Sequence, residues 1–184
     1  MTTAPVVLVL ASGRGERFKA SGSAVHKLDA LLLGKAVLEH TLDAVRTTGL
    51  PYHVERGNHA GMGDCIAAAV AATRSSAGWL VLPGDMPLIC PEIILMVADA
   101  MTQFEIAVPT FQSRRGHPVG FPKICQESLL SLGGDVGAKK VMQKFPNINV
   151  PIDHMAHGQS CLIDVDTLKD LAFAAHWLSK AKSP

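Results

Sequence analysis

Short, almost continuous apolar runs alternate with longer stretches of helical spacing along this chain. Residues 6–11 (VVLVLA) and 79–82 (WLVL) are apolar at nearly every position, which is typical of strands that are buried on both faces of a sheet. Segment 114–122 (RRGHPVGFP) is expected to be irregular or at a sheet edge, because its prolines cannot donate to a strand ladder. Shorter strands are expected at 51–55, 105–110 and 148–152.

The stretches between these runs carry apolar residues at the spacing of a helix. Residues 35–49 place apolar side chains three or four positions apart and end on Gly49, which is a suitable stop signal. Asp64 is the expected N-cap of an alanine-rich helix at 64–78. Further helices are expected at 91–101, near 123–132, at 135–145 and at 167–180.

This alternation of strands and helices predicts an α/β fold, with a mostly parallel sheet covered by helices on both faces. The chain has 184 residues, which favours a single domain over residues 1–184. Hydrophobic residues make up 48% of the sequence and charged residues 18%, with a formal net charge of +1. These values predict a globular protein and argue against a general nucleic-acid-binding surface.

The four cysteines are widely spaced and form no C-x-x-C pair. This spacing argues against a zinc ribbon or a disulfide framework, so reduced thiols in a cytoplasmic protein are expected. The first apolar run is too short to span a membrane, and no targeting segment is visible. We therefore expect no association with a membrane.

The loop after the first strand is the most basic and glycine-rich segment of the sequence. Residues 12–26 begin with SGRGER, which includes Arg14 and Arg17, and Lys27 follows directly. In open α/β sheets, ligands bind beyond the carboxyl ends of the strands, and backbone N–H groups next to positive side chains suit a phosphate group. A solvated, mobile loop is the alternative interpretation.

Two common phosphate-binding motifs do not fit this loop. The dinucleotide fingerprint G-x-G-x-x-G fails at Phe18, and no acidic residue follows at the end of a second strand to contact a ribose. The P-loop pattern G-x-x-x-x-G-K-[ST] is absent as well. A dinucleotide-dependent oxidoreductase is therefore a weakened alternative.

Aspartates stand at two points where the chain is expected to reach the same sheet edge. Asp85 follows the second continuous apolar run, and a carboxylate beside bound phosphates is the usual way to bind Mg²⁺. A simple turn residue is the alternative for Asp85. Asp164 and Asp166 would share one face if the chain is extended there, although Asp166 or Thr167 could instead cap the last helix.

Six segments of the sequence occur in an order that is informative. They are the glycine–arginine loop with Lys27, GMGDCIAAAV, PGDMPLI, RRGHPVGFP, GDVGAKKVM and DVDTLKDL, and they span nearly the whole chain. In this order they resemble the MobA-like nucleotidyltransferase family, and within it the molybdenum cofactor cytidylyltransferase branch. The resemblance implies a Rossmann-like sheet and a Mg²⁺-dependent transfer of a nucleoside monophosphate to a phosphorylated acceptor, with release of pyrophosphate.

The resemblance also implies roles for individual residues. Arg17 and Lys27 match the family's phosphate-contacting arginine and lysine, and with Asp85 they form the expected catalytic set. Asp85 and Asp166 match the two metal ligands, with Asp164 as the near alternative. The residues expected to bind the nucleotide are Ala11, Ser12, Gly13, Arg14, Gly15, Gly61, Met62, Gly63, Asp64, Cys65, Ile66, Pro83 and Gly84.

His117 and Asp135 match family positions near the acceptor, for which the molybdopterin cofactor is the expected compound. The expected partners are thus an NTP, with CTP favoured, and a phosphorylated small molecule, together with a molybdoenzyme or its chaperone. The acceptor phosphate already carries the nucleophilic oxygen, so the protein has to supply positioning and electrostatic stabilisation. His53 and His59 are expected to be ordinary surface or loop residues.

Two departures from the family pattern stand out in this sequence. Lys27 follows Arg17 by ten residues, more than is usual for the family, so an insertion is expected to bulge at 20–24. A βα unit is expected to be missing near 46–60. The alternatives left open are a guanylyltransferase, a transferase to another phosphorylated acceptor and a non-catalytic nucleotide-binding protein.

Overall fold

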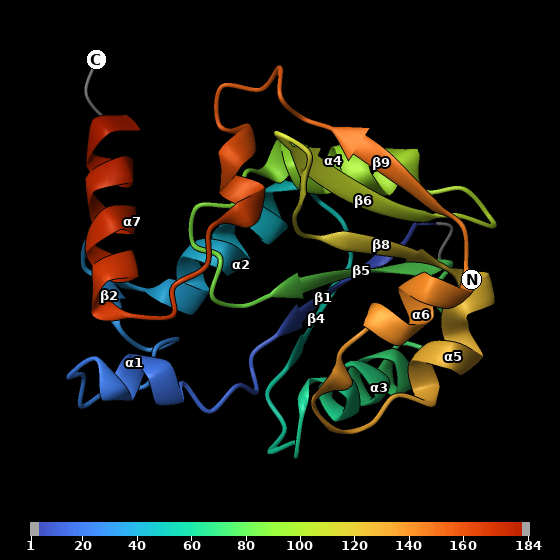
Figure 1. Ribbon diagram of the computed structural model, residues 1–184, viewed down its shortest axis with the longest axis horizontal. Coiled ribbons are helices and arrows are strands. Elements are labelled where there is room, and N and C mark those ends of the chain that lie inside the picture. Colours follow the sequence, from blue (N-terminus) through green and yellow to red (C-terminus); the bar gives the residue numbers. More distant parts are fainter. Residues whose placement is uncertain (1–3, 182–184) are drawn as a thin grey trace.

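The computed structural model describes residues 4–181, and its centre is a sheet with helices on both faces (Figure 1). In these residues the sheet has seven strands in the order β4-β1-β5-β8-β6-β7, and β9 also pairs with β6. The strands are β1 (Val6–Leu10), β4 (Tyr52–Glu55), β5 (Gly78–Pro83), β6 (Ile106–Phe111), β7 (Arg114–Arg115), β8 (Val119–Pro122) and β9 (Asn147–Pro151). The pairs β1–β4, β1–β5 and β6–β9 are parallel, which confirms the predicted α/β fold.

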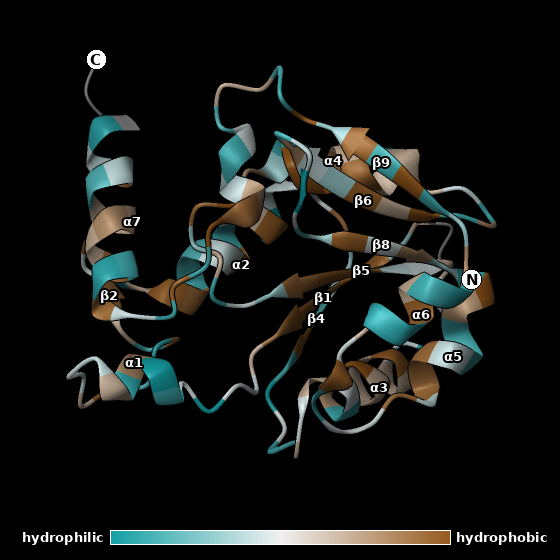
Figure 2. Ribbon diagram, in the orientation of Figure 1, coloured by the Kyte–Doolittle hydropathy of each residue, from teal (hydrophilic) through white to brown (hydrophobic). Residues whose placement is uncertain are grey.

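Strands β1 and β5 are continuously apolar because both of their faces are buried. Val7 and Val9 of β1 pack on one side of the sheet, and Leu8 packs on the other. The first side is covered by α2 (Val37–Thr47) and α4 (Pro91–Ala100). The second side is covered by α3 (Met62–Ala72), the 3₁₀ turn η1 (Lys123–Cys125), α5 (Gln126–Leu130) and α6 (Lys139–Lys144). Apolar residues are accordingly concentrated in the central strands (Figure 2).

A third, smaller apolar cluster lies beside the sheet. It joins α1 (Glu16–Ala20), the short hairpin β2–β3 (Leu31–Leu32 and Lys35–Ala36) and α7 (Leu168–Ala181), which stands apart from the main layers in Figure 1. Phe18 is completely buried in this cluster. The sequence analysis predicted neither α1 nor the hairpin, because both are too short to show a periodic pattern.

The prediction for segment 114–122 is confirmed at its start, where Arg114–Arg115 form β7 at the end of the sheet order, and was wrong at its end. Strand β8 lies inside the sheet, antiparallel to both β5 and β6, and all of its residues are buried. Pro118 precedes the strand and Pro122 is its last residue, so the prolines bracket the strand instead of interrupting its ladder. Gly120 pairs with Leu80, and a Cβ at Gly120 would lie 2.8 Å from the side chain of Met101.

Several helix boundaries also differ from the predicted ones. Helix α3 begins at Met62 after Gly61, so Asp64 lies in its first turn and is not the N-cap. Residues 56–61 join β4 directly to α3, in agreement with the short connection expected there. Two 3₁₀ turns that the sequence analysis missed are η2 (Gly134–Val136) and η3 (Gly158–Leu162). None of the helices in residues 4–181 is long and apolar enough to cross a membrane.

Candidate active site

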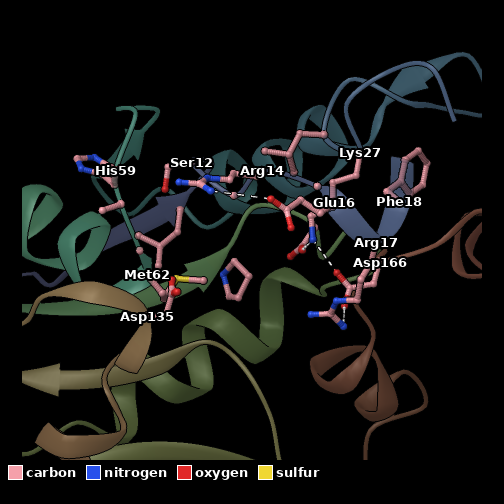
Figure 3. Close-up of a pocket in the computed structure, with 18 residues that line it drawn as sticks. Ser12, Arg14, Glu16, Arg17, Phe18, Lys27, His59, Met62, Asp135 and Asp166 are labelled. Carbon is pink, nitrogen blue, oxygen red and sulfur yellow. Dashed lines mark hydrogen bonds and ion pairs between the residues drawn. The ribbon is translucent and has the colours of Figure 1, made fainter. Parts of the chain in front are cut away.

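A cavity of about 440 Å³ opens where β1 and β5 end. Ser12 to Gly15 form one wall, and Gly15 has a φ of 64°, a left-handed conformation that suits glycine. The buried ring of Phe18 anchors the helix that follows. The cavity is lined by Leu10, Ser12, Gly13, Arg14, Gly15, Glu16, Arg17, Phe18, Lys27, Leu28, His59, Ala60, Gly61, Met62, Pro83, Asp85, Asp135 and Asp166 (Figure 3).

Asp85 lies at the floor of this cavity, only 9% exposed, directly after β5. The N–H of Gly84 donates to the carbonyl of Leu10 at 2.9 Å, and a Cβ at Gly84 would lie 3.0 Å from that same oxygen. The close approach of the two strand ends therefore requires glycine at this position. It places the carboxylate of Asp85 next to the loop that follows β1.

Residues 164–166 bring a second acidic segment to the same place. The N–H of Val165 donates to the carbonyl of Asp85 at 2.9 Å, while the Val165 side chain is fully buried. The flanking residues Asp164 and Asp166 share the opposite face, as alternation predicts. Carboxylate oxygens of Asp85, Asp164 and Asp166 all lie within 4.8 Å of one another.

The start of α7 leaves the Asp166 side chain free for the site. The Asp170 carboxylate accepts from the N–H of Thr167 at 2.7 Å, and the N–H of Asp170 donates to the Thr167 hydroxyl at 3.3 Å. This reciprocal capping box identifies Thr167 as the N-cap, one of the two candidates named from the sequence. Asp166 therefore does not cap the helix.

Two cations neutralise the acidic segment. Nζ of Lys27 lies 2.5 Å from Oδ2 of Asp85 and 2.7 Å from Oδ1 of Asp166, and a guanidinium nitrogen of Arg17 lies 2.5 Å from Oδ2 of Asp166. Lys27 thus reaches the site despite the longer loop before it. Burial alone would lower the Lys27 pKa, but the negative charges of Asp85 and Asp166 outweigh it and raise the pKa. At Asp164, burial and then the neighbouring carboxylates raise the pKa.

The acidic segment also fits a divalent cation. Oδ1 of Asp85 is buried and has no hydrogen-bonding partner among the described residues, so one carboxylate oxygen of the cluster is unsatisfied. Three carboxylates supply only oxygen ligands, which hard cations such as Mg²⁺ and Mn²⁺ prefer. Asp85 and Asp166, with Asp164 beside them, are therefore suitable residues to bind such an ion.

The far end of the cavity is formed by the N-terminal turn of α3. Gly61 and Met62 line it, as expected, whereas Gly63, Asp64, Cys65 and Ile66 lie behind the wall. Cys65 and Ile66 are core residues, 0% and 2% exposed. Burial raises the pKa of the Cys65 thiol, while a hydrogen bond with Ser12 opposes the shift. The expectation that residues 63–66 line the nucleotide site is thus corrected: they support the wall from behind.

The two residues expected near the acceptor lie in different places. Asp135 lines the cavity on the side of Met62 (Figure 3). His117 does not line it, and its Nδ1 is buried without a partner among the described residues. Burial lowers the His117 pKa, and the opposing influence of Asp85 shows that the two side chains are close. His117 is therefore a partly buried residue behind the cavity lining.

Three remaining predicted positions surround the loop. Pro83 lines the cavity, and Gly84 supports it through the contact with Leu10. Ala11 lines a separate hollow on the outer side of the loop, and its N–H donates to the Glu55 carbonyl at 2.8 Å.

Several lining residues were missed by the sequence analysis. They include His59, expected to be an ordinary loop residue, whose Nε2 pairs with Oε1 of Glu55 at 2.9 Å. The four-residue spacing of Glu55 and His59 was the available signal, but outside a helix such spacing carries little weight. The other missed lining residues are Leu10, Phe18, Leu28 and Ala60.

Parallel strands β4, β1 and β5 with a glycine-rich loop and carboxylates beyond their carboxyl ends are typical of a nucleotide-binding α/β protein. A family model described as the MobA-like NTP transferase domain matches residues 43–150, which is more than half of the chain. The chain belongs to this family, which confirms the resemblance to the MobA-like family seen in the sequence, while the molybdenum cofactor cytidylyltransferase branch stays a prediction.

A curated relative agrees with this assignment. The bifunctional protein GlmU of Halorhodospira halophila is 28% identical over 149 residues, which cover 67% of this chain and 29% of the relative. The match therefore spans less than a third of that protein's length.

Solved structures show that the Rossmann-like fold is shared. Rv0371c of Mycobacterium tuberculosis superposes with a TM-score of 0.78 at 22% identity, over 96% of this chain and 100% of that chain. Another structure of Rv0371c, described as a complex with manganese, gives a TM-score of 0.72 at 22% identity over 95% and 99% of the two chains. Molybdopterin-guanine dinucleotide biosynthesis protein A of Archaeoglobus fulgidus gives 0.68 at 17% identity over 95% and 99%.

Proposed function

We propose that this protein is a nucleotidyltransferase that transfers CMP from Mg²⁺-bound CTP to the phosphate of a small acceptor, the molybdopterin cofactor, and releases pyrophosphate. The observation that supports it most is the convergence of Arg17, Lys27 and three aspartates on one cavity beside a glycine-rich loop. An anion-binding loop and a cation-binding acidic cluster are the two components that metal-assisted transfer from a nucleoside triphosphate requires.

In the proposed reaction, an oxygen of the acceptor phosphate attacks the α-phosphorus of the NTP. The bond from that phosphorus to the bridging oxygen breaks, and pyrophosphate leaves with the bonding electrons. A divalent cation at Asp85 and Asp166 would supply neutralisation of the charge on the α-phosphate and the leaving group. Backbone N–H groups of residues 12–15 would orient the triphosphate.

Lys27 and Arg17 also have to serve the triphosphate in this mechanism. Both now pair with Asp166, and each side chain is long enough to exchange a carboxylate for a phosphate oxygen. His117 does not line the cavity, so its expected role near the acceptor would require the site to rearrange. A molybdoenzyme or its chaperone as protein partner and a cytoplasmic location remain part of this proposal, and the four free cysteines agree with the latter.

A guanine nucleotide is the second candidate donor. It is favoured by the likeness to the Archaeoglobus fulgidus protein, whose name describes molybdopterin-guanine dinucleotide biosynthesis. Steady-state kcat/KM for CTP, GTP, UTP and ATP with molybdopterin as acceptor separates the two candidates. If kcat/KM for GTP exceeds that for CTP tenfold or more, GTP and not CTP is the donor.

The first prediction concerns the substitution Asp85→Asn, which removes a charged ligand with little change of shape. We expect pyrophosphate release in the presence of the acceptor to fall by at least ~10²-fold, as for the loss of other preorganised charge contacts. The control is Asp153→Asn, because Asp153 lies outside the cavity. Normal turnover of the Asp85→Asn protein at saturating Mg²⁺ would refute the assignment of Asp85.

A further inference from the structure

The cavity has two ends of different chemistry. Arg17 and Lys27 lie at one end, whereas Asp135 lies at the other, on the side of Met62 and His59 (Figure 3). The Asp135 carboxylate has no ionic or hydrogen-bonding partner in residues 4–181. An unpaired carboxylate therefore faces the cavity at this end, whereas at the other end Arg17 and Lys27 are paired with Asp85 and Asp166.

A specific contact fixes the loop that carries Asp135. Oδ2 of Asp64, in the first turn of α3, accepts a hydrogen bond from the N–H of Gly134 at 2.9 Å. The two segments also touch through their backbones: a Cβ at Gly61 would lie 2.3 Å from the carbonyl carbon of Gly134. A Cβ at Gly63 would lie 2.8 Å from the carbonyl oxygen of Gly133. The loop that carries Asp135 is thus packed tightly against the first turn of α3 and held there by the Asp64 hydrogen bond.

A nucleotide fits the two ends of the cavity in one orientation only, with its triphosphate at the end of Arg17 and Lys27 and its nucleoside at the end of Asp135. A triphosphate offers hydrogen-bond acceptors and negative charge, so it suits the end where the backbone N–H groups of residues 12–15, Arg17 and Lys27 lie and where a divalent cation would offset the aspartates. Asp135 brings no such partner to the other end and would repel the phosphates. A carboxylate can only accept hydrogen bonds, and the nucleoside offers donors in its ribose hydroxyls and base amino group. A triphosphate bound by the loop after β1 leaves the α3 end of the cavity to the attached nucleoside.

We infer that Asp135 recognises hydrogen-bond donors of the bound nucleoside and that Asp64 positions it through Gly134. This inference rests on the proposed function and moves Asp135 from the acceptor to the nucleotide. Asp135 is then a specificity-determining residue of the cavity. Asp64, which was expected to contact the nucleotide, acts through the loop instead.

The test measures binding of Mg-CTP by calorimetry without any acceptor, so that no transfer occurs. Asp135→Ala is expected to weaken binding by about tenfold or more, because a hydrogen bond to a charged group is lost. Asp135→Asn retains an accepting oxygen and should lie between Ala and the native residue. If Asp135 acted only as a repelling charge, both variants would bind Mg-CTP more tightly, and the inference would fail.

Analogues separate the two possible donors on the nucleoside. If Asp135 binds a ribose hydroxyl, 2′-deoxy-CTP or 3′-deoxy-CTP loses affinity for the native protein but not for Asp135→Ala. If it binds the base amino group, UTP shows that pattern instead. Equal losses for every analogue in the native and Asp135→Ala proteins would contradict any contact with the nucleoside.

The positioning role of Asp64 has its own readout. Asp64→Ala should weaken Mg-CTP binding in the native background but add little in the Asp135→Ala background, because both changes act through one loop. Asp64→Asn, whose amide oxygen can still accept from Gly134, should restore most of the affinity. Additive losses would mean that Asp64 acts independently of Asp135.

A matched control is available at another loop. Oδ1 of Asp153 accepts from the N–H of Gln112 at 2.7 Å, a side-chain-to-backbone contact of the same kind outside the cavity. Asp153→Ala should leave Mg-CTP binding unchanged. If Asp135→Ala binds Mg-CTP normally and instead raises the KM of the acceptor, the inference fails while the proposed function stands. If the native protein binds no NTP, the proposed function fails.

Discussion

At the scale of single residues, Lys27 occupies the position between two carboxylates that a metal ion would need. Its Nζ contacts Asp85 and Asp166, and the Lys27 side chain is 13% exposed. Lysine and a divalent cation therefore compete for the same oxygens in the protein without nucleotide. Phosphate groups that attract Lys27 would free those oxygens, so metal and nucleotide are expected to bind cooperatively.

The second prediction follows from this competition. Lys27→Met should raise the affinity of the nucleotide-free protein for Mn²⁺ by about tenfold, equivalent to about 1.4 kcal/mol. It should also lower thermal stability in the absence of metal, because two carboxylates lose their counter-charge, and Mn²⁺ should restore the loss. Electron paramagnetic resonance of free Mn²⁺ measures the affinity.

The matched control for Lys27→Met is Lys35→Met. Lys35 also pairs with an aspartate, Asp43, at 2.5 Å, but this ion pair is far more exposed to solvent. The control should leave Mn²⁺ affinity unchanged. Unchanged affinity in Lys27→Met itself would show that the lysine does not occupy the cation position.

Single residues of the site were predictable only where the sequence pattern marks an element's end. Asp85 and Asp166 could be found because each follows an apolar segment of recognisable type. His59 could not, because its cavity position depends on how residues 56–61 fold between β4 and α3. Cys65 and Ile66 were misplaced because a motif shows which segment approaches a ligand, but not which side of the helix faces it.

At the scale of elements, helix α1 anchors the basic loop that follows β1. Phe18, where a dinucleotide fingerprint would have glycine, is fully buried between the β2–β3 hairpin and α7. The exposed tip at 20–24 is attached to the rest of the structure, because the Ser21 hydroxyl accepts a hydrogen bond from the N–H of Leu168 at 3.1 Å. The loop that carries Arg17 is thereby tied to the start of α7.

The third prediction tests this anchoring. Phe18→Ala should destabilise the protein by about 3–5 kcal/mol, as is usual for a buried phenylalanine. It should also weaken Mg-NTP binding, because Arg17 loses its support. Denaturant unfolding and calorimetry measure the two effects. Phe104→Ala is the control, since Phe104 is 63% exposed. A stable Phe18→Ala protein would contradict the packing described here.

The sequence could predict those elements whose own residues carry the pattern of a strand or helix, and not those whose place depends on distant partners. The runs at β1 and β5 are apolar on both faces, and no arrangement other than a buried strand satisfies them. Strand β8 has equally buried residues, but Gly120 and the prolines at its two ends, Pro118 before it and Pro122 as its last residue, hide the signal that a strand normally shows. Its central position depends on pairing with β5 and β6, which lie far away in sequence.

At the scale of the whole molecule, the cavity is lined by residues of all three apolar clusters, Leu28, Leu10 and Phe18, and by the loops between them. Lys27 and Asp166 come from segments around the small third cluster, while Met62 belongs to the helix layer on the far face of the sheet. A ligand that spans the cavity would connect these parts. Its binding free energy would then stabilise the folded molecule as a unit.

The fourth prediction measures this stabilisation. Mg-CTP at a hundred times its Kd should add about 2.7 kcal/mol, which raises the melting temperature by roughly 5–10 °C for a protein of this size. Cytidine, which lacks the phosphates, should have little effect at the same concentration. A melting transition that separates into two steps on addition of Mg-CTP would contradict the idea that the ligand connects the parts.

The hydrogen bond from Val165 to the Asp85 carbonyl has a consequence for how the protein is made. A chain leaves the ribosome from its N-terminus, and its earlier segments begin to fold first. Arg17, Lys27 and Asp85 are therefore synthesised long before Asp166, the carboxylate that pairs with both cations. Until residues 164–166 emerge, Arg17 lacks this partner and Asp85 has only Lys27 among the contacts described here. The site is thus completed late in translation, so a nascent chain that has not reached these residues should have no transferase activity.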